Sequence, residues 1–346
     1  MIEKKYTIKD IAELAGVSKG TVDRVLHNRG RVSKDAKERV NKVVTDIDYQ
    51  PNLIARSLKN NKVYRISALI PDATLDSYWL PTVKGVDEAV QEFKPFGLVL
   101  DKYYFNPKKV KSFQEQVELV VQSKPDAILL APVFHKESLK IFQYCKQNKI
   151  QVASFNNHID NLSLEHFIGQ DLNQSGRVAA SLIDKVTDKD SRIAVIHIDE
   201  ETHMRHKEIG FRDYFKEKYK DSKKIVSYSI NNKKSINLND EISLFMASHE
   251  AISAVFVTNS KAYLIVDILK KENKKIVIVG YDLLKDNIRF LKRGQIEFLI
   301  HQKPYQQAYL GVSYLAENLL FGKNIPEKKL LPIDIITAEN VKYYSS

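Results

Sequence analysis

Apolar residues recur at helical spacing in three short segments at the start of the chain. Residues 8–15 place isoleucine and alanine on one helix face, and Gly16 ends this segment because glycine readily adopts the left-handed conformation of helix C-termini. A second segment follows Ser18 and is broken by Gly30, and a third follows Ser33. Serine is a preferred helix N-cap. The pattern predicts three short helices with a tight turn between the first two.

The pattern changes from Val63 onward. Short apolar runs that are typical of buried strands alternate with amphipathic stretches of helical length. The runs are VYRISALIP, GLVLDKYYF, DAILLAPVF, QVASFNN, HFIGQ, RIAVIHI, IVSYSI, AVFVTN and KIVIVGYD. Strands that alternate with helices indicate parallel sheets covered on both faces. Because there are too many strands for one small sheet, we expect an α/β body of two doubly wound subdomains with a cleft between them.

Composition places the chain among globular proteins. Its 346 residues suffice for two or three domains, and 43% of them are hydrophobic and 28% charged. A single cysteine, Cys145, excludes an intrachain disulfide and fits a reducing compartment. The N-terminus lacks the apolar segment of a signal peptide, and no apolar run approaches the roughly 18–20 residues of a membrane span. We therefore expect a cytoplasmic protein without membrane segments.

The positive charge is concentrated at the N-terminus. Residues 1–62 hold 14 Lys and Arg against 8 Asp and Glu, while the rest of the chain holds 40 against 35. A basic end on a nearly balanced body favours a polyanion as its partner, although a lysine-rich surface that only increases solubility is the alternative. In a helix-turn-helix the second helix presents its first residues to the major groove. The small, polar and charged residues at that place are Ser18, Lys19, Gly20, Thr21, Asp23 and Arg24.

Catalytic motifs are absent from the sequence. It contains no Gly-x-Gly pair, and so neither a dinucleotide fingerprint nor a P-loop, and no Gly-x-Ser-x-Gly turn. His203 and His206 form an H-x-x-H with no cysteine or carboxylate cluster nearby, which is a weak basis for a metal site. Cys145 lies on an apolar helical face and is expected in the core. We expect no enzymatic activity, no cofactor and no metal.

The N-terminal sequence resembles the DNA-binding headpiece of the lactose repressor (LacI) family. The similarity covers about fifty residues and includes the Asp-Ile-Ala, Ala-Gly-Val-Ser, Thr-Val-x-Arg-Val and Tyr-x-Pro-Asn motifs. It implies a headpiece over residues 1–50 and a hinge helix over 51–62 that folds when two copies meet in the minor groove of DNA. In that helix Leu58 would wedge between base pairs. The implied DNA-binding residues are Thr7, Ser18, Lys19, Gly20, Thr21, Asp23, Arg24, Asn28, Tyr49, Asn52, Ala55, Arg56 and Leu58.

The body resembles the ribose-type periplasmic binding proteins and the cores of LacI-family regulators. The similar segments include DSYWLPTVKGV, FNNHID, RHKEIGFRDYF, VGYDLL and IHQKPYQQAYLGV. In this fold the chain crosses between subdomains three times. The resemblance implies one effector-binding and dimerisation domain over residues 63–346. Its first subdomain would take about 63–162 and 288–324, and its second about 163–287 and 325–346.

The same resemblance implies which residues bind the effector. Trp79 and its neighbour would stack on a sugar ring, and Asp282 is the strongest single candidate for a polar contact. Asn156 and Asn157 stand where relatives usually have an aspartate and an arginine. Lys207 stands where relatives usually have an arginine that grips the ligand, and Arg205, two residues away, could take over that contact. The implied effector-binding residues are Tyr78, Trp79, Asn156, Asn157, Arg205, Lys207, Asn259, Asp282 and Gln302.

Together these features predict a ligand-responsive, DNA-binding transcriptional regulator, a repressor of carbohydrate-use genes. Two chains would form a homodimer and bind a pseudo-palindromic site on double-stranded DNA, and a sugar or sugar derivative in the cleft would alter the order of the hinge helix. The sequence is compatible with induction and with corepression. The alternatives are a sugar-binding protein of the same fold that acts without DNA, and a regulator with a non-sugar effector.

Overall fold

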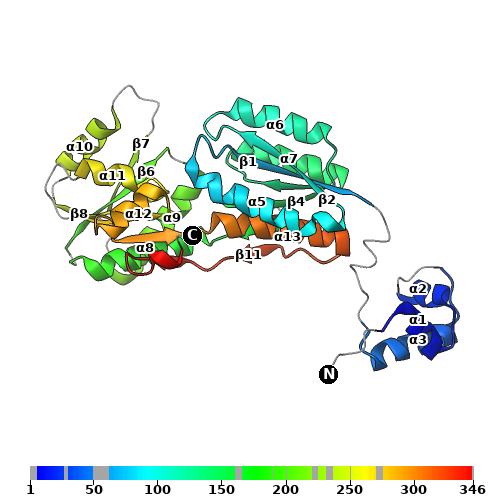
Figure 1. Cartoon of the computed structure of the whole chain (residues 1–346). Coiled ribbons are helices and arrows are strands. Elements are labelled where there is room, and N and C mark those ends of the chain that lie inside the picture. Colours follow the sequence, from blue (N-terminus) through cyan, green and yellow to red (C-terminus); the bar gives the residue numbers. More distant parts are fainter. Residues whose placement is uncertain are drawn as a thin grey trace. The chain divides into compact units, whose positions relative to one another are not determined.

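The protein forms two compact units, residues 1–59 and 60–346, in a computed structural model (Figure 1). The structure describes residues 6–26, 30–49, 62–159, 166–188, 190–199, 201–219, 225–230, 237–249, 251–269 and 276–344.

The described part of the N-terminal unit consists of three short helices, as the apolar pattern predicts. They are α1 (Ile8–Ala15), α2 (Lys19–Leu26) and α3 (Lys34–Asp46). Thr7 and Asp10 form a capping box at the start of α1, and Gly16 ends that helix at a φ of 62°. The buried core of this unit comprises Ile11, Ala12, Ala15, Val22, Val25 and Val40.

The described strands of the body form two six-stranded sheets. The first has the order β11-β5-β4-β3-β1-β2 and the second β12-β10-β9-β8-β6-β7. All pairings are parallel except that of β10 with β12. The first sheet contains β1 (Tyr64–Pro71), β2 (Leu98–Phe105), β3 (Ala127–Leu130), β4 (Gln151–Phe155), β5 (His166–Gly169) and β11 (Lys328–Leu330). The second contains β6 (Arg192–Ile198), β7 (Ile225–Ile230), β8 (Ile252–Val257), β9 (Val277–Tyr281), β10 (Phe298–His301) and β12 (Asp334–Ile336).

Helices cover both faces of each sheet. In the first subdomain α5 (Leu80–Phe93) and α13 (Pro304–Phe321) pack on one face, and α6 (Val110–Gln122) and α7 (His135–Asn148) on the other (Figure 1). In the second, one face carries α8 (Leu172–Val186) and α9 (Thr202–Tyr219). Its other face carries α10 (Leu238–Ser248), α11 (Ala262–Leu269) and α12 (Lys285–Lys292). Cys145 lies in the core under α7, where burial raises the pKa of its thiol to about 12.

The subdomain boundaries expected from the sequence are wrong by several residues at each crossing. Strand β5 pairs with β4, so residues 166–169 belong to the first subdomain rather than the second. Strand β10 pairs with β9, so residues 298–301 belong to the second rather than the first. Strand β11 joins the first sheet through β5. The chain therefore crosses after β5, between β10 and α13, and between β11 and β12. The boundaries shift because each crossing is preceded by a short strand that still belongs to the sheet of the subdomain before the crossing.

A single glutamine joins the three crossings. The side-chain amide of Gln170, which follows β5, donates hydrogen bonds to the backbone oxygens of His301 (3.0 Å) and Pro332 (2.8 Å). His301 ends β10, and Pro332 lies between β11 and β12. One buried side chain, on the first connecting segment, thus bonds to the other two segments that connect the subdomains.

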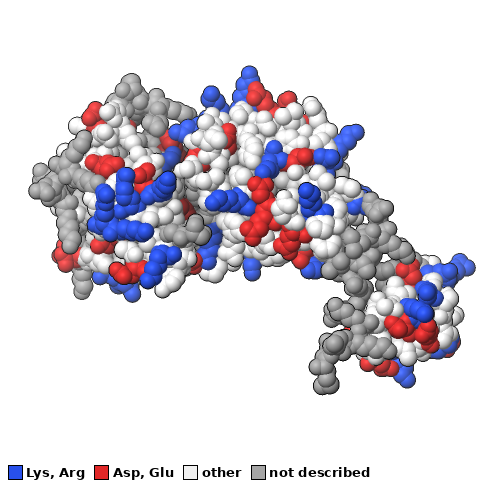
Figure 2. Space-filling view, in the orientation of Figure 1, with Lys and Arg blue, Asp and Glu red and all other residues white. Residues whose placement is uncertain are grey.

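Basic side chains are also exposed on the body. Figure 2 shows Lys and Arg gathered over the region of α12, where Lys285, Arg289, Lys292 and Arg293 are exposed. Arg289 pairs with Asp286 at 3.0 Å. None of the helices in the described ranges combines the length and the apolar character that crossing a membrane requires.

Candidate functional site

Helix α2 presents the polar residues that the sequence singles out. Val22 and Val25 are buried against α1 and α3, whereas Ser18, Lys19, Gly20 and Arg24 are exposed. The Ser18 hydroxyl oxygen accepts a hydrogen bond from the backbone N–H of Thr21 at 3.1 Å, which orders the first turn of the helix. Because one face is buried, the other is free to meet a ligand.

The other predicted DNA-contacting residues fall into two groups. Thr7 is exposed and caps α1, and Tyr49 packs partly buried against the core of the N-terminal unit, while Asp23 is half-buried on α2. Asn28, Asn52, Ala55, Arg56 and Leu58 lie outside the described residues, as does the expected hinge helix.

The predicted aromatic pair follows the first strand of the body. Tyr78 and Trp79 form a short 3-10 helix, η1 (Ser77–Trp79), and their rings meet edge to face with centroids 5.0 Å apart. Trp79 also packs edge-on against Phe155, so most of its ring lies in the core of the first subdomain. The Tyr78 hydroxyl accepts a hydrogen bond from the Asn156 side-chain amide.

A continuous hydrogen-bond network runs from the first subdomain to the second. The backbone N–H of Asn156 donates to Oε1 of Gln307 at 2.7 Å, and Nε2 of Gln307 donates to the backbone oxygen of Gln302 at 2.6 Å. Gln302 in turn donates to both carboxylate oxygens of Asp282, through its backbone N–H at 2.9 Å and its Nε2 at 2.6 Å. All four residues are buried. With the Lys207 side chain, which bonds to Gln302, the structure brings five predicted residues into one connected group: Tyr78, Asn156, Lys207, Asp282 and Gln302.

Two of these residues adopt backbone conformations uncommon for side-chain-bearing residues. Asn156, directly after β4, has a φ of 70°, and Asp282, directly after β9, has a φ of 63°. Asn and Asp tolerate the left-handed region better than other such residues. The sharp bends turn these side chains into the space at the carboxyl ends of the strands, where open α/β sheets bind ligands.

Lys207 lies at the centre of the second subdomain's part of the site. Its side chain on α9 is fully buried, and Nζ donates to the Thr258 backbone oxygen at 3.1 Å and to Oε1 of Gln302 at 3.0 Å. Nζ also lies 3.7 Å from the ring centroid of Tyr281. Burial lowers the pKa of its amine to about 7, although the negative charges of Asp282 and Glu201 oppose that shift. Arg205, two residues away, is exposed.

The side-chain amides of Asn259 and Asn157 differ in their hydrogen bonding. Nδ2 of Asn259 donates to the backbone oxygen of Ile198 at 2.6 Å, and its Oδ1 accepts from the backbone N–H of Lys261 at 3.2 Å. That side chain therefore ties the end of β6 to the turn after β8. Oδ1 of Asn157, in contrast, is buried without a hydrogen-bond partner.

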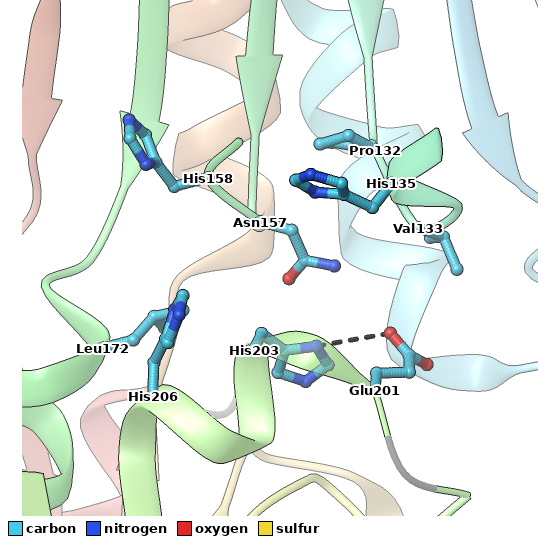
Figure 3. Close-up of a pocket in the computed structure, with 9 residues that line it drawn as sticks. All are labelled: Pro132, Val133, His135, Asn157, His158, Leu172, Glu201, His203 and His206. Carbon is cyan, nitrogen blue, oxygen red and sulfur yellow. Dashed lines mark ion pairs between the residues drawn. The ribbon is translucent and has the colours of Figure 1, made fainter. Parts of the chain in front are cut away.

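A small pocket opens beside Asn157, between the two subdomains (Figure 3). Residues from both subdomains line it: Pro132, Val133, His135, Asn157, His158, Leu172, Glu201, His203 and His206. In Figure 3 the Asn157 side chain points across the pocket toward His203. Nδ1 of His203 is the second buried atom here without a hydrogen-bond partner, although it lies 3.3 Å from a Glu201 carboxylate oxygen. Because Nδ1 of His203 faces Glu201, the buried Oδ1 of Asn157 is the acceptor that this pocket leaves for a small polar ligand.

Burial also shapes the electrostatics of the pocket. It lowers the pKa of the His203 imidazole, with the nearby Glu201 carboxylate opposing that shift. A neutral imidazole can donate one hydrogen bond and accept another. No three His, Cys, Asp or Glu side chains among the described residues are placed to hold a metal ion together. The arrangement suits recognition of hydroxyl groups by hydrogen bonding.

Sequence reasoning missed several residues of this site. Gln307 connects Asn156 to Gln302, Gln170 joins the crossings, and Asp199 pairs with lysines from both subdomains. Glu201 and His203 line the pocket. Polar residues next to strand ends were a usable signal for Asp199 and Gln170. Nothing in the sequence distinguishes Gln307 from the glutamine beside it.

Comparison with known proteins identifies both units. A family model described as "Bacterial regulatory proteins, lacI family" matches residues 7–52, and one described as "Periplasmic binding protein domain" matches residues 67–324. The ribose operon repressor of Lactococcus lactis is 26% identical over 97% of this chain and 98% of that protein. The sucrose operon repressor of Klebsiella pneumoniae is 47% identical over 21% of this chain and 23% of that protein.

Solved structures show the same body fold. A LacI transcriptional regulator from Bacteroides fragilis has a TM-score of 0.76 and 27% identity, covering 82% of this chain and 100% of its own. A glucose-galactose binding protein from Geobacillus stearothermophilus has a TM-score of 0.68 and 19% identity, covering 81% of this chain and 99% of its own. The latter likeness concerns the fold alone.

Proposed function

The chain belongs to the LacI family of bacterial regulatory proteins, and on that premise we propose that it is a transcriptional regulator whose effector is a small sugar bound between the two subdomains of its body. The observation that carries this proposal is the buried network of Tyr78, Asn156, Gln302 and Asp282, which offers hydrogen-bonding groups at the carboxyl ends of strands in both sheets. The pocket beside Asn157 adds the buried Oδ1 of that residue, an acceptor without a hydrogen-bond partner.

The names of the relatives support a sugar as the effector. Relatives that are similar over nearly the whole chain or over about a fifth of it include ribose and sucrose operon repressors. A solute-binding protein from Burkholderia graminis with this fold was solved with D-arabinose. We therefore place neutral monosaccharides first among the candidates for this protein.

In the proposed mechanism two copies pair through their bodies and hold two N-terminal units on one pseudo-palindromic DNA site. The effector binds more tightly to one arrangement of the subdomains, so it shifts the balance between arrangements by the difference in affinity. That shift changes the spacing at residue 63 and thereby the folding of residues 51–62 in the minor groove. The protein performs no catalysis in this scheme and acts in the cytoplasm, where the chromosome lies.

A thermal unfolding screen of the full chain tests the effector assignment. The panel contains ribose, arabinose, galactose, glucose and sucrose and their acids and phosphates. Nucleosides represent the alternative of an effector that is not a simple sugar. A ligand at 100 times its dissociation constant adds about 2.7 kcal/mol to stability. Stabilisation by a neutral sugar is the expected result. Stabilisation by nucleosides alone would contradict the assignment.

A second experiment tests the regulatory function. Sites selected from a random DNA pool are titrated with the full chain at one fixed salt concentration, with and without the sugar that stabilises it. We expect a two-fold symmetric site and a change in affinity on adding the sugar. Failure to select any preferred site would support the alternative of a sugar-binding protein that acts without DNA.

A further inference from the structure

The ammonium group of Lys207 directs its hydrogen-bond donors to groups of the protein itself. Two of its donors meet the Thr258 backbone oxygen and the Gln302 side-chain oxygen, at 3.1 and 3.0 Å, and its remaining side faces the Tyr281 ring at 3.7 Å. The side chain is 0% exposed. A buried ammonium that is matched in this way has no donor left for an effector.

The side-chain amide of Gln302 bridges Lys207 and Asp282 by hydrogen bonds. An ammonium only donates hydrogen bonds and a carboxylate only accepts them, so an amide between them must turn its oxygen to the lysine and its nitrogen to the aspartate. The structure shows this orientation, with Oε1 of Gln302 toward Lys207 and Nε2 2.6 Å from Asp282. Below the Lys207 pKa of about 7, the two buried charges therefore balance one another through one amide.

Helix packing explains why Lys207 lies so deep. Helices α8 and α9 cross at two glycines: a Cβ atom on Gly176 would lie 1.8 Å from the backbone oxygen of Lys207, and one on Gly210 would lie 1.9 Å from that of Asn173. The two helices thus approach closely at Lys207 and at Asn173. Only glycine allows this spacing, which fixes the backbone from which the lysine side chain extends.

Two further lysines at the cleft are paired with a carboxylate. Lys261 and Lys108 both contact Asp199, at 2.6 and 3.2 Å. The described lysines at this place therefore offer no unmatched positive charge to an anionic ligand.

We propose that Lys207 is a positioning residue that orients Gln302 and, through it, Asp282 without contacting the effector. The cleft consequently selects an uncharged polyhydroxylated effector over a sugar acid or a sugar phosphate. The selectivity part rests on the proposed sugar-binding function. The positioning part stands on the contacts within the ligand-free protein.

Nuclear magnetic resonance on the full chain labelled at glutamine tests the positioning role without a ligand. The side-chain amide signals of Gln302 are identified by their loss in Gln302→Leu. Lys207→Met keeps an unbranched side chain that is one atom shorter and removes its donors. Lys216→Met, at an exposed site on the same helix, is the matched control. We expect the Gln302 amide signals to move in Lys207→Met and to stay in place in Lys216→Met. Unmoved signals in Lys207→Met, in a protein that remains folded, would overturn the positioning role.

Calorimetric titration with two matched sets tests the selectivity. The probes are D-ribose, D-ribonate and D-ribose 5-phosphate, and D-galactose, D-galactonate and D-galactose 6-phosphate. We expect at least one neutral sugar to bind tenfold or more tightly than either of its anionic derivatives. Tighter binding of an anionic derivative would overturn the selectivity. Absence of binding by all six would instead contradict the proposed sugar function, while the resonance experiment still decides the role of Lys207.

Discussion

Lys108 and Asp199 form an ion pair between the two subdomains. Nζ of Lys108, in the segment after β2, lies 3.2 Å from Oδ2 of Asp199, which directly follows β6. Burial raises the pKa of the Asp199 carboxyl, but hydrogen bonds and charge from Lys261 and Lys108 outweigh it and hold the pKa below its usual value. The pair thus favours the arrangement in which the subdomains are together.

Removing this ion pair should weaken effector binding slightly. The Lys108 side chain is 61% exposed, and exposed pairs typically contribute about 1 kcal/mol or less. We expect Lys108→Met to raise the dissociation constant of a stabilising sugar by no more than about fivefold. The loss should shrink as salt rises, because salt screens exposed charges. Lys111→Met, at a more exposed lysine nearby, is the control. A salt-independent loss would show that Lys108 acts in another way.

Asp282→Asn should abolish the response to the sugar while the body remains folded. Asn is the suitable replacement because residue 282 has a φ of 63°, which Ala would adopt only with strain. The change removes the charge that balances Lys207 and replaces an acceptor of two hydrogen bonds from Gln302. Thermal unfolding with and without the sugar measures the effect. A variant that the sugar stabilises as strongly as the wild type would refute a role for Asp282 in the site.

Alanine at either glycine of the α8–α9 crossing should destabilise the body strongly. The added Cβ of Gly176→Ala would lie 1.8 Å from a backbone oxygen, which cannot move without separating the helices. Overpacking typically costs about 1–3 kcal/mol and occasionally more, so we expect a loss of about 3 kcal/mol in the free energy of unfolding. Gly294→Ala is the comparison, because it meets no atom within 4 Å but has a φ of +64°. Equal losses at the two sites would show that backbone strain, rather than the crossing, sets the cost.

The buried lysine should make stability depend on pH above neutrality. The pKa of Lys207 is about 7 in the folded protein, below the ordinary 10.5, so between these values the unfolded chain binds a proton that the folded chain lacks. Stability therefore rises with pH in this window, with a slope of up to about 1.4 kcal/mol per pH unit from this group. Denaturant unfolding from pH 7 to 9.5 should show a steeper rise in the wild type and in Lys216→Met than in Lys207→Met. Parallel curves for all three would contradict this origin of the pH dependence.

The hinge-helix hypothesis rests on the sequence and predicts a specific loss of DNA binding. Leu58→Ala removes the side chain expected to wedge between base pairs, and we expect at least a tenfold weaker affinity, about 1.4 kcal/mol, for a selected site. Anisotropy titrations at one salt concentration measure it. Stabilisation by the sugar should be unchanged, because residue 58 lies outside the body. Wild-type affinity for the selected site would refute the wedge.

The sequence predicted the large elements better than the site. Within the described residues the three N-terminal helices and the nine apolar runs appear where the patterns put them, as α1 to α3 and β1 to β9. The strands β10, β11 and β12 were missed, and β11 and β12 have only three residues each. All three residues of β11 are exposed, so it carries no apolar pattern. Such strands are identified only by their backbone pairing with a neighbouring strand in the structure.

The contacts of the site could be predicted only as residue types. Asp282 and Gln302 were expected in the site through the family resemblance, and they do contact one another. That Lys207 would be fully buried does not follow from its charge, since buried lysines are rare. Its burial depends on two glycines, one of which lies on another helix, and on an acid 75 residues away along the chain. Such dependence on distant partners is beyond what local patterns encode.

The C-terminal segment contributes one strand to each sheet, β11 to the first and β12 to the second. During synthesis the ribosome releases the chain from its N-terminus, so the helices of the N-terminal unit can fold while the body is still being made. Neither sheet can be completed until residues 328–336 have emerged from the ribosome. A nascent chain therefore carries its DNA-binding helices before it has a finished body to control them, and that interval lasts until residues 328–336 have emerged.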